Sequence, residues 1–342
     1  MIGVGIVGYG YWGPNLARCV AETEGCEISA IADVSPAALA KAGKRHPAAC
    51  LTADWQSVIA NPAVGAVLIA TPVKTHFQIA LAALRAGKHV FVEKPITQTS
   101  CEAAVLIAEA QRQNLVLMVD HTFVYTGAVQ KIHQLVSDGT LGNIYYYDST
   151  RINLGLFQRD VNVIWDLAVH DLAILDFLMD AVPAAVSANG ANHVTDGPDN
   201  MAYMTVYFEN GMIAHINVNW LAPVKIRQVL IGGSKRMIVY DDLQPSEKVK
   251  VYDRGVTLTT SADENYKGLV SYRLGDMFGP ELSNKEALLT EIEHFVDCIE
   301  HGKVPLTSGE CGLRVVKTLE AASLSLRQQG HPIELAPLSK AS

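Results

Sequence analysis

Three glycines with G-x-G-x-x-G spacing, Gly8, Gly10 and Gly13, follow the first apolar run of this 342-residue chain and precede a helical pattern. In such a loop the first glycine permits a tight turn, and the second lets a phosphate approach the backbone. The third lets the helix pack closely on the strand, and amides at a helix N-terminus bind anions. The loop therefore predicts a pyrophosphate site for a dinucleotide, with Tyr11 and Trp12 beside it.

Asp33 ends the second apolar run, 20 residues after Gly13. At this position a carboxylate accepts hydrogen bonds from the ribose hydroxyls of the dinucleotide. It would also repel a 2′-phosphate, and no arginine follows at once, since the nearest basic residues are Lys41, Lys44 and Arg45. We therefore predict NAD as the cofactor, with NADP disfavoured. The alternative is an aspartate that only caps the next helix, a position for which Ser35 competes.

The fourth apolar run ends in Glu93-Lys94-Pro95. Ligands of open α/β sheets bind at the carboxyl ends of the strands, so Glu93 and Lys94 should point into the cofactor crevice. Thr71 and Pro72 end the third run in the same layer, and His76 lies one turn into the following helical pattern. The alternative is a solvated charge pair before a turn proline.

Asp166 and His170 are four residues apart at the start of an apolar helical pattern, which places them on one helix face. A secondary alcohol gives up hydride only as its hydroxyl proton leaves, and histidine is the side chain best suited to take that proton near neutral pH. Asp166 could orient the imidazole, and Lys94 could stabilise the developing alkoxide. Asp166 could instead be a helix cap and His170 a buried histidine satisfied by a carbonyl group.

The elements that position these residues fall into two groups. Up to about residue 120, short apolar runs alternate with helical patterns, which is typical of a parallel sheet with crossover helices. The expected strands are 3–7, 27–32, 66–70, 89–92 and 116–119, and the expected helices are 14–22, 36–45, 76–86 and 100–113. The predicted fold of this part is an α/β Rossmann domain.

After residue 123 most strands follow one another without crossover helices, which predicts an α+β domain with an open, mainly antiparallel sheet. Three helices, 128–137, 285–301 and 309–329, accompany the one that begins at Asp166. The expected strands are 144–150, 185–192, 201–209, 212–219, 226–231, 237–240, 249–252 and 256–260. The predicted organisation is a Rossmann domain at 1–122, an α+β domain at 123–335 and a frayed tail at 336–342.

The polar segment 151–162 joins the first strand of the second domain to the helix that carries Asp166. Its side chains could bind substrate hydroxyls, although an ordinary surface loop explains each of them equally well. Polar amides interleaved with tryptophan suit a sugar ring, which has hydroxyls at its edge and an apolar face. The candidate substrate residues are Arg151, Asn153, Gln158, Asn162 and Trp165.

Together these motifs resemble the Gfo/Idh/MocA oxidoreductases, a family that includes glucose-fructose oxidoreductase and inositol dehydrogenase, and the resemblance covers nearly the whole chain. It implies that Lys94, Asp166 and His170 are catalytic, with Lys94 between nicotinamide and substrate. It also implies that Glu93 helps to hold the cofactor and that Thr71 and Pro72 border the nicotinamide. The free face of the second sheet would mediate assembly into a homo-oligomer, a dimer or tetramer.

The sequence thus predicts an NAD-dependent oxidoreductase that acts on a secondary hydroxyl of a sugar, a cyclitol or a nucleotide-linked sugar. One alternative is an enzyme that keeps and recycles NAD, using transient oxidation for elimination or glycoside cleavage. Another is a non-catalytic NAD-binding sensor, which would need no proton acceptor.

Composition argues against other classes. With 27 Lys+Arg against 35 Asp+Glu, the formal charge is −8, which disfavours nucleic-acid binding. No run approaches the ~20 apolar residues that a membrane span needs. The six cysteines show no C-x-x-C pair and no metal-ligand spacing, so we expect reduced thiols, no metal site and a cytoplasmic protein without a signal peptide.

Overall fold

The structure is a computed structural model that describes all residues except 156–160, 195, 259–269 and 336–342. The chain forms two compact units, one made of Met1–Thr126 with Lys285–Lys317 and the other of Gly127–Asn284 with Thr318–Ser342. The C-terminal part therefore returns a segment to the first unit, which the sequence did not indicate. The predicted tail, 336–342, lies outside the described residues.

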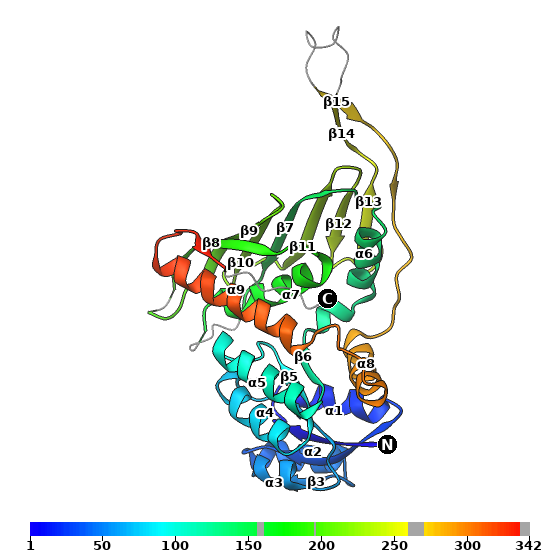
Figure 1. The fold of residues 1–342 in the computed structure, drawn as a ribbon, viewed down its shortest axis with the longest axis vertical. Coiled ribbons are helices and arrows are strands. Elements are labelled where there is room, and N and C mark those ends of the chain that lie inside the picture. Colours follow the sequence, from blue (N-terminus) through cyan, green and yellow to red (C-terminus); the bar gives the residue numbers. More distant parts are fainter. Residues whose placement is uncertain (156–160, 195, 259–269, 336–342) are drawn as a thin grey trace. The chain divides into compact units, whose positions relative to one another are not determined.

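The first unit contains a six-stranded parallel sheet with the order β3-β2-β1-β4-β5-β6, and this confirms the predicted Rossmann fold (Figure 1). The strands are β1 (Ile2–Val7), β2 (Cys26–Ala32), β3 (Cys50–Thr52), β4 (Ala66–Ile69), β5 (His89–Glu93) and β6 (Leu117–Asp120). The strand order reverses between β1 and β4, and ligands of such sheets bind at this switch point, at the carboxyl ends of the strands.

Helices connect these strands. Two of them begin directly after a residue whose side chain caps the helix N-terminus. The Ser35 hydroxyl accepts a hydrogen bond from the Ala38 amide at the start of α2, so the cap is Ser35. Thr99 and Glu102 form a capping box at the start of α5. The helical elements are α1 (Gly13–Glu22), α2 (Pro36–Arg45), α3 (Trp55–Ala60), η1 (Val73–Thr75), α4 (His76–Arg85), α5 (Ser100–Gln113), η2 (Thr122–Tyr125) and α8 (Ala287–His301).

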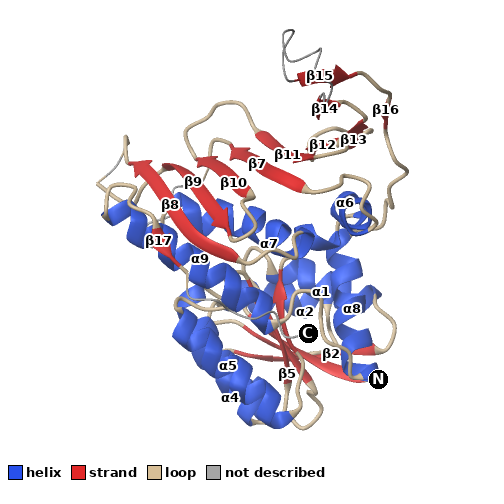
Figure 2. Cartoon of the chain, turned by 45° about the horizontal axis from the view of Figure 1, so that its top comes forward, coloured by secondary structure: helices blue, strands red, loops and turns tan. Residues whose placement is uncertain are grey.

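The second unit is built on a nine-stranded sheet with the order β16-β13-β12-β11-β7-β10-β9-β8-β17 (Figure 2). Only β7 and β10 pair in parallel, so the prediction of an open, mainly antiparallel sheet is confirmed. Its strands are β7 (Ile144–Ile152), β8 (Pro183–Ala191), β9 (Met201–Phe208), β10 (Ile213–Asn219), β11 (Ile226–Gly233), β12 (Met237–Asp241), β13 (Val249–Tyr252), β16 (Met277–Phe278) and β17 (Ile333–Glu334). A separate ribbon pairs β14 (Gly255–Leu258) with β15 (Val270–Arg273).

One face of this sheet is covered by helix. The Tyr147 hydroxyl of β7 donates to the Asp171 carbonyl of α7 at 3.4 Å, which places α7 over the face that carries Tyr147. On the strands β7, β9 and β10, Tyr146, Tyr207 and Ile213 are neighbours in register and are 36–45% exposed. The helical elements are α6 (Gly127–Ser137), the π-helical η3 (Ile164–Ala168), α7 (Val169–Leu178) and α9 (Gly309–Arg327), which begins in the first unit and ends in the second.

Within the described ranges, no helix is both long enough and apolar enough to cross a membrane. The six cysteines are free thiols in the structure.

Candidate functional site

The glycine loop after β1 has the geometry that dinucleotide binding requires. Gly8 has φ +96°, and a Cβ on it would lie 2.5 Å from the Ala70 carbonyl oxygen. A Cβ on Gly13 would clash with the Gly8 carbonyl, so this glycine lets α1 begin directly against the turn. At Gly10, by contrast, a Cβ would meet nothing within 4 Å. The loop thus leaves open space at the one glycine where a pyrophosphate has to approach the backbone.

Asp33, after β2, is held in place by this loop. Its Oδ2 atom accepts a hydrogen bond from the Tyr9 amide at 2.6 Å, and its Oδ1 atom accepts one from the Ser35 amide at 2.7 Å. The carboxylate therefore has a fixed orientation and keeps lone pairs for further donors. It lines a cavity of ≈560 Å³ together with Gly10 of the loop and with Lys41, Lys44 and Arg45 of α2.

The two aromatic residues of the loop differ in their surroundings. Tyr11 is 93% exposed, whereas the Trp12 indole Nε1 donates to Asp120 Oδ2 at 2.8 Å. Asp120 ends β6, and its Oδ1 atom accepts from the Thr122 hydroxyl at 2.6 Å. Through Asp120, the end of β6 fixes the middle of the glycine loop.

His76 joins the ends of two neighbouring strands. Its Nδ1 and Nε2 atoms lie 3.0 Å from the Pro95 carbonyl and 2.8 Å from the Thr71 carbonyl, and the ring is buried. This ring connects the turn after β5 to the end of β4, so it holds Thr71 and the Glu93-Lys94-Pro95 segment in register. Pro72 is exposed, and Thr71 accepts a hydrogen bond from the Thr75 hydroxyl at 2.7 Å.

Glu93 and Lys94 lie at the carboxyl end of β5, where the sequence places them. The Glu93 carboxyl has two acidic neighbours, Asp120 and Glu291. Burial and Asp120 raise the pKa of Glu93 well above its usual value, and Lys94 opposes this shift. Sequence reasoning missed Asp120 and Glu291. A signal for Asp120 was available, because it ends β6 as Glu93 ends β5.

In the second unit, Asp166 lies in the π-helical segment η3, and His170 lies in the first turn of α7. The Trp220 indole, which is buried, donates from Nε1 to Asp166 Oδ2 at 3.0 Å. The Asp166 amide donates to the Asn162 carbonyl at 3.3 Å. π-Helical turns are frequent at functional sites. The carboxylate that the sequence predicts to accompany His170 is therefore oriented by the Trp220 indole.

Arg151 has a partner that the sequence did not indicate. Its Nε atom donates to Asp171 Oδ2 at 2.7 Å and its Nη2 atom donates to Asp171 Oδ1 at 3.2 Å, and both residues are buried. The Ser149 hydroxyl also donates to Asp171 Oδ1, at 2.7 Å. We expected Arg151 to contact substrate, but this ion pair connects β7 to α7 and accounts for its burial.

Of the other residues predicted to bind substrate, Asn162 lies just before η3 and Trp165 lies within it, whereas Asn153 directly follows β7. Asn162 Oδ1 accepts from the Trp165 amide at 3.2 Å, which satisfies a donor at the beginning of the helix. The Trp165 indole donates to the Ser323 hydroxyl at 2.8 Å. The Asn153 amide donates to the Asn219 carbonyl at 3.2 Å, and its side chain is half-buried. Gln158 lies outside the described residues.

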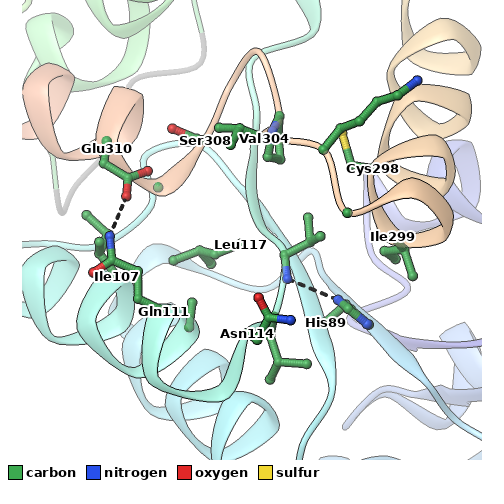
Figure 3. A pocket seen from close by; sticks show the side chains of 17 residues that line it. His89, Ile107, Gln111, Asn114, Leu117, Cys298, Ile299, Val304, Ser308 and Glu310 are labelled. Atoms are coloured by element: carbon green, nitrogen blue, oxygen red, sulfur yellow. Dashed lines mark hydrogen bonds between the residues drawn. The ribbon is translucent and has the colours of Figure 1, made fainter. Parts of the chain in front are cut away.

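A second cavity of the first unit, of ≈330 Å³, lies elsewhere on the sheet (Figure 3). It is lined by His89 and Leu117, which begin β5 and β6, so it lies at the amino ends of these strands. Gln111 Nε2 donates to Glu310 Oε1 at 3.0 Å beside it. The glycine loop lies at the opposite ends of the strands, so this cavity does not belong to the candidate cofactor site. No group of His, Cys, Asp and Glu side chains suited to a metal ion is found in the part of the chain that the structure describes.

Known proteins resemble both parts of the chain. Residues 2–121 match the model of the oxidoreductase family with an NAD-binding Rossmann fold, and residues 129–239 match the GFO/IDH/MocA C-terminal domain. UDP-N-acetylglucosamine 3-dehydrogenase from Acidithiobacillus ferrooxidans is 32% identical over 267 residues, which are 77% of this chain and 78% of that protein.

A solved structure of UDP-N-acetylglucosamine 3-dehydrogenase from the same organism superposes with a TM-score of 0.80 at 27% identity, and the match covers 96% of this chain and 99% of that one. A more distant relative is 2,7-anhydro-N-acetylneuraminate hydratase from Mediterraneibacter gnavus. It is 24% identical over 357 residues, which are 95% of this chain and 94% of that protein.

Proposed function

The chain belongs to the Gfo/Idh/MocA oxidoreductase family and has its NAD-binding Rossmann fold, and from this premise we propose a substrate class and the roles of individual residues. The proposed substrate carries a secondary hydroxyl on a sugar, a cyclitol or a nucleotide-linked sugar. Hydride passes to NAD from the carbon that bears this hydroxyl, or returns from reduced NAD to the corresponding ketone carbon. The observation that carries the proposal is the glycine loop, which is open at Gly10 and adjoins the fixed carboxylate of Asp33.

The first unit supplies the cofactor site. The loop amides between Gly8 and Gly13 bind the pyrophosphate, and Asp33 accepts the ribose hydroxyls, which favours NAD over NADP. Lys94 directly follows β5, and the family resemblance is the basis for assigning its ammonium to the nicotinamide end of the cofactor. When bound, the nicotinamide accepts or returns the hydride.

The second unit supplies the proton acceptor. His170 takes the hydroxyl proton on its imidazole as the C–H bond breaks, and Asp166, oriented by the Trp220 indole, supports the resulting charge. The Lys94 ammonium stabilises the negative charge that develops on the substrate oxygen. Asn153, Gln158, Asn162 and Trp165 are the proposed contacts to the sugar. Arg151 is left out of this set because its guanidinium pairs with Asp171.

The test is a turnover screen of free and nucleotide-linked sugars and cyclitols with NAD and NADP, followed by two variants. Lys94→Ala and His170→Ala should each lower turnover by at least ~100-fold, the scale for loss of an acid–base or electrostatic group. NAD binding should survive in both variants, because neither side chain holds the adenosine half. Near-normal turnover in either variant would remove that residue from the mechanism.

The hydratase relative favours a second candidate, in which NAD stays bound and a transient oxidation activates the substrate for elimination. The absorbance of reduced nicotinamide separates the two candidates. It accumulates with turnover in a dehydrogenase and does not accumulate when the cofactor is recycled.

We also propose that the protein works as a homo-oligomer in the cytoplasm. The row of Tyr146, Tyr207 and Ile213 gives the uncovered sheet face an apolar surface that a second copy could bury. The free thiols suit a reducing compartment.

A further inference from the structure

Three carboxyl groups meet inside the first unit. Glu93 ends β5 and Asp120 ends β6, and these residues are partners in the register of the two parallel strands. Glu291 comes from α8 and is fully buried. Each glutamate lies within hydrogen-bonding reach of Asp120. We call Glu93, Asp120 and Glu291 the carboxyl cluster.

The hydrogen bonds of the carboxyl cluster are unequal. Both oxygens of Asp120 have donors, the Trp12 indole at 2.8 Å and the Thr122 hydroxyl at 2.6 Å. Each glutamate has a backbone donor on only one oxygen, because the Lys94 amide donates to Glu93 Oε2 at 3.1 Å and the His121 amide donates to Glu291 Oε1 at 3.0 Å. The other oxygens, Glu93 Oε1 and Glu291 Oε2, are buried and meet no donor among the residues that the structure describes.

Two carboxylates cannot hydrogen-bond to each other, since both are acceptors only, so each contact with Asp120 needs a proton. Asp120, with two external donors, is best able to remain ionised, and the protons then reside on the glutamates. Burial, followed by the charge of Asp120, raises the pKa of Glu93 and of Glu291 well above the usual value. Other titratable groups also lie beside the cluster, among them the buried imidazole of His121, which directly follows Asp120. Lys94 opposes the shift at Glu93, Glu291 lies near the buried phenol of Tyr125, and Asp120 lies near the Cys19 thiol.

We propose that the carboxyl cluster holds two protons, one on Glu93 and one on Glu291, around a single carboxylate on Asp120, and that it thereby positions the glycine loop through Trp12. Glu93 and Glu291 are then hydrogen-bond donors to Asp120, and Asp120 is the acceptor that fixes the Trp12 indole. Ionisation of either glutamate would place a second negative charge beside Asp120 and loosen this arrangement. The effect on cofactor binding rests on the proposed function, whereas the proton count does not.

Infrared spectroscopy of the full chain, without cofactor, tests the proton count. A neutral carboxylic acid has a carbonyl band distinct from that of a carboxylate, so the wild type should show acid bands at neutral pH. Glu93→Gln and Glu291→Gln should each remove one band, whereas Glu300→Gln, an exposed position on the same helix as Glu291, should remove none. A wild-type spectrum without acid bands at neutral pH would overturn the proposal, whether or not the variants fold.

The pH dependence of stability is the second test. A glutamate whose folded pKa exceeds its unfolded value of ~4.3 makes the protein less stable as the pH rises between the two values, because the folded state binds the additional proton. Glutamine has no such dependence and can still donate to Asp120 through its amide. The melting temperature of Glu291→Gln should therefore rise relative to the wild type as the pH increases from roughly 5 to 8, a range that begins above the unfolded pKa of ~4.3. A constant difference across this range would indicate a merely structural residue and contradict the proposal.

NAD titration connects the cluster to the loop. Trp12→Phe removes the indole donor, and it should weaken NAD binding by roughly tenfold, which corresponds to the lower limit for one hydrogen bond to a charged group. If the wild type shows acid bands but binds no NAD, the proposed function fails and the proton count stands. If NAD binds but Trp12→Phe binds it as tightly as the wild type, the positioning role is refuted.

Discussion

Replacement of Asp33 by asparagine should shift the cofactor preference toward NADP. Asparagine has nearly the same shape, but it carries no charge and keeps one acceptor oxygen in place of two. It can therefore hold either the Tyr9 amide or the Ser35 amide, which bind separate oxygens of the carboxylate at 2.6 and 2.7 Å. The loop will be weakened to some extent. NAD and NADP both bind to this loop, so a loss of affinity caused by the weakened loop is the same for both and does not change the ratio of their affinities.

Two free-energy contributions then determine how far the ratio of NAD affinity to NADP affinity changes. NAD loses a hydrogen bond between its ribose and a charged acceptor, which is about 1.5–3 kcal/mol. NADP is relieved of repulsion between the carboxylate and its 2′-phosphate, which at about 4 Å is about 1 kcal/mol per charge pair in water and about 4 kcal/mol near a protein surface. The lower limits sum to about 2.5 kcal/mol, so the ratio should shift toward NADP by roughly 100-fold.

The measurement is a titration of the wild type and Asp33→Asn with both cofactors in oxidised form. Lys44→Ala in the Asp33→Asn background is the matched control, because Lys44 lines the same cavity as Asp33 and can attract the 2′-phosphate. The Lys44→Ala change should lower the affinity for NADP and leave the affinity for NAD nearly unchanged. The loss of NADP affinity should be smaller at high salt, because the Lys44 side chain is exposed and its charge is screened. An unchanged NAD-to-NADP ratio in Asp33→Asn would refute the assignment of Asp33 to the ribose.

Three further sets of variants test the remaining assignments. Gly10→Ala should retain the melting temperature and weaken NAD binding because its Cβ enters open space over the loop, whereas Gly13→Ala, whose Cβ meets the Gly8 carbonyl, should lower both. Arg151→Ala should reduce the free energy of unfolding by about 3–5 kcal/mol in urea titrations, and Arg151→Met with Asp171→Leu should recover most of it; equal stability of the single variant and the wild type would contradict a buried ion pair. Ile213→Lys should shift light scattering toward the monomer without a loss of NAD binding, and an unchanged mass would exclude this sheet face as the interface.

Much of the fold could be predicted because its signals are local. Helices α2 and α5 begin and end where the sequence places them, and both have side-chain caps that are visible in the sequence. Strand β3 and helix α3 were missed, since three and six residues are too short for a periodic pattern. The return of α8 to the first unit depends on packing between distant residues, such as Phe295 against Phe91 with ring centroids 5.6 Å apart, and no local pattern reports such contacts.

In the candidate site, too, the features that depend on local sequence could be predicted, and the contacts between distant residues could not. The glycine loop and Asp33 were predictable because their chemistry depends on spacing within one strand–helix–strand segment. The partners that fix the predicted side chains were not, because each comes from a distant part of the chain: Asp120 lies 108 residues from Trp12, and Trp220 lies 54 residues from Asp166. Arg151 is a further example, because its partner Asp171 lies 20 residues away on another element.

The distant partners Asp120 and Trp220 share a property that matters for the mechanism, which is their burial. Asp120 and Trp220 are buried, and each holds a polar atom of a residue placed by sequence in the site, within one unit of the chain. A group held by a buried partner loses little conformational freedom when a ligand arrives, so less binding energy is spent on ordering it. A hydride transfer gains most from this arrangement, because the proton acceptor and the electrostatic group act only when both are already oriented. The loop of the first unit and the Asp166 carboxylate of the second are therefore each held by a buried partner from the same unit.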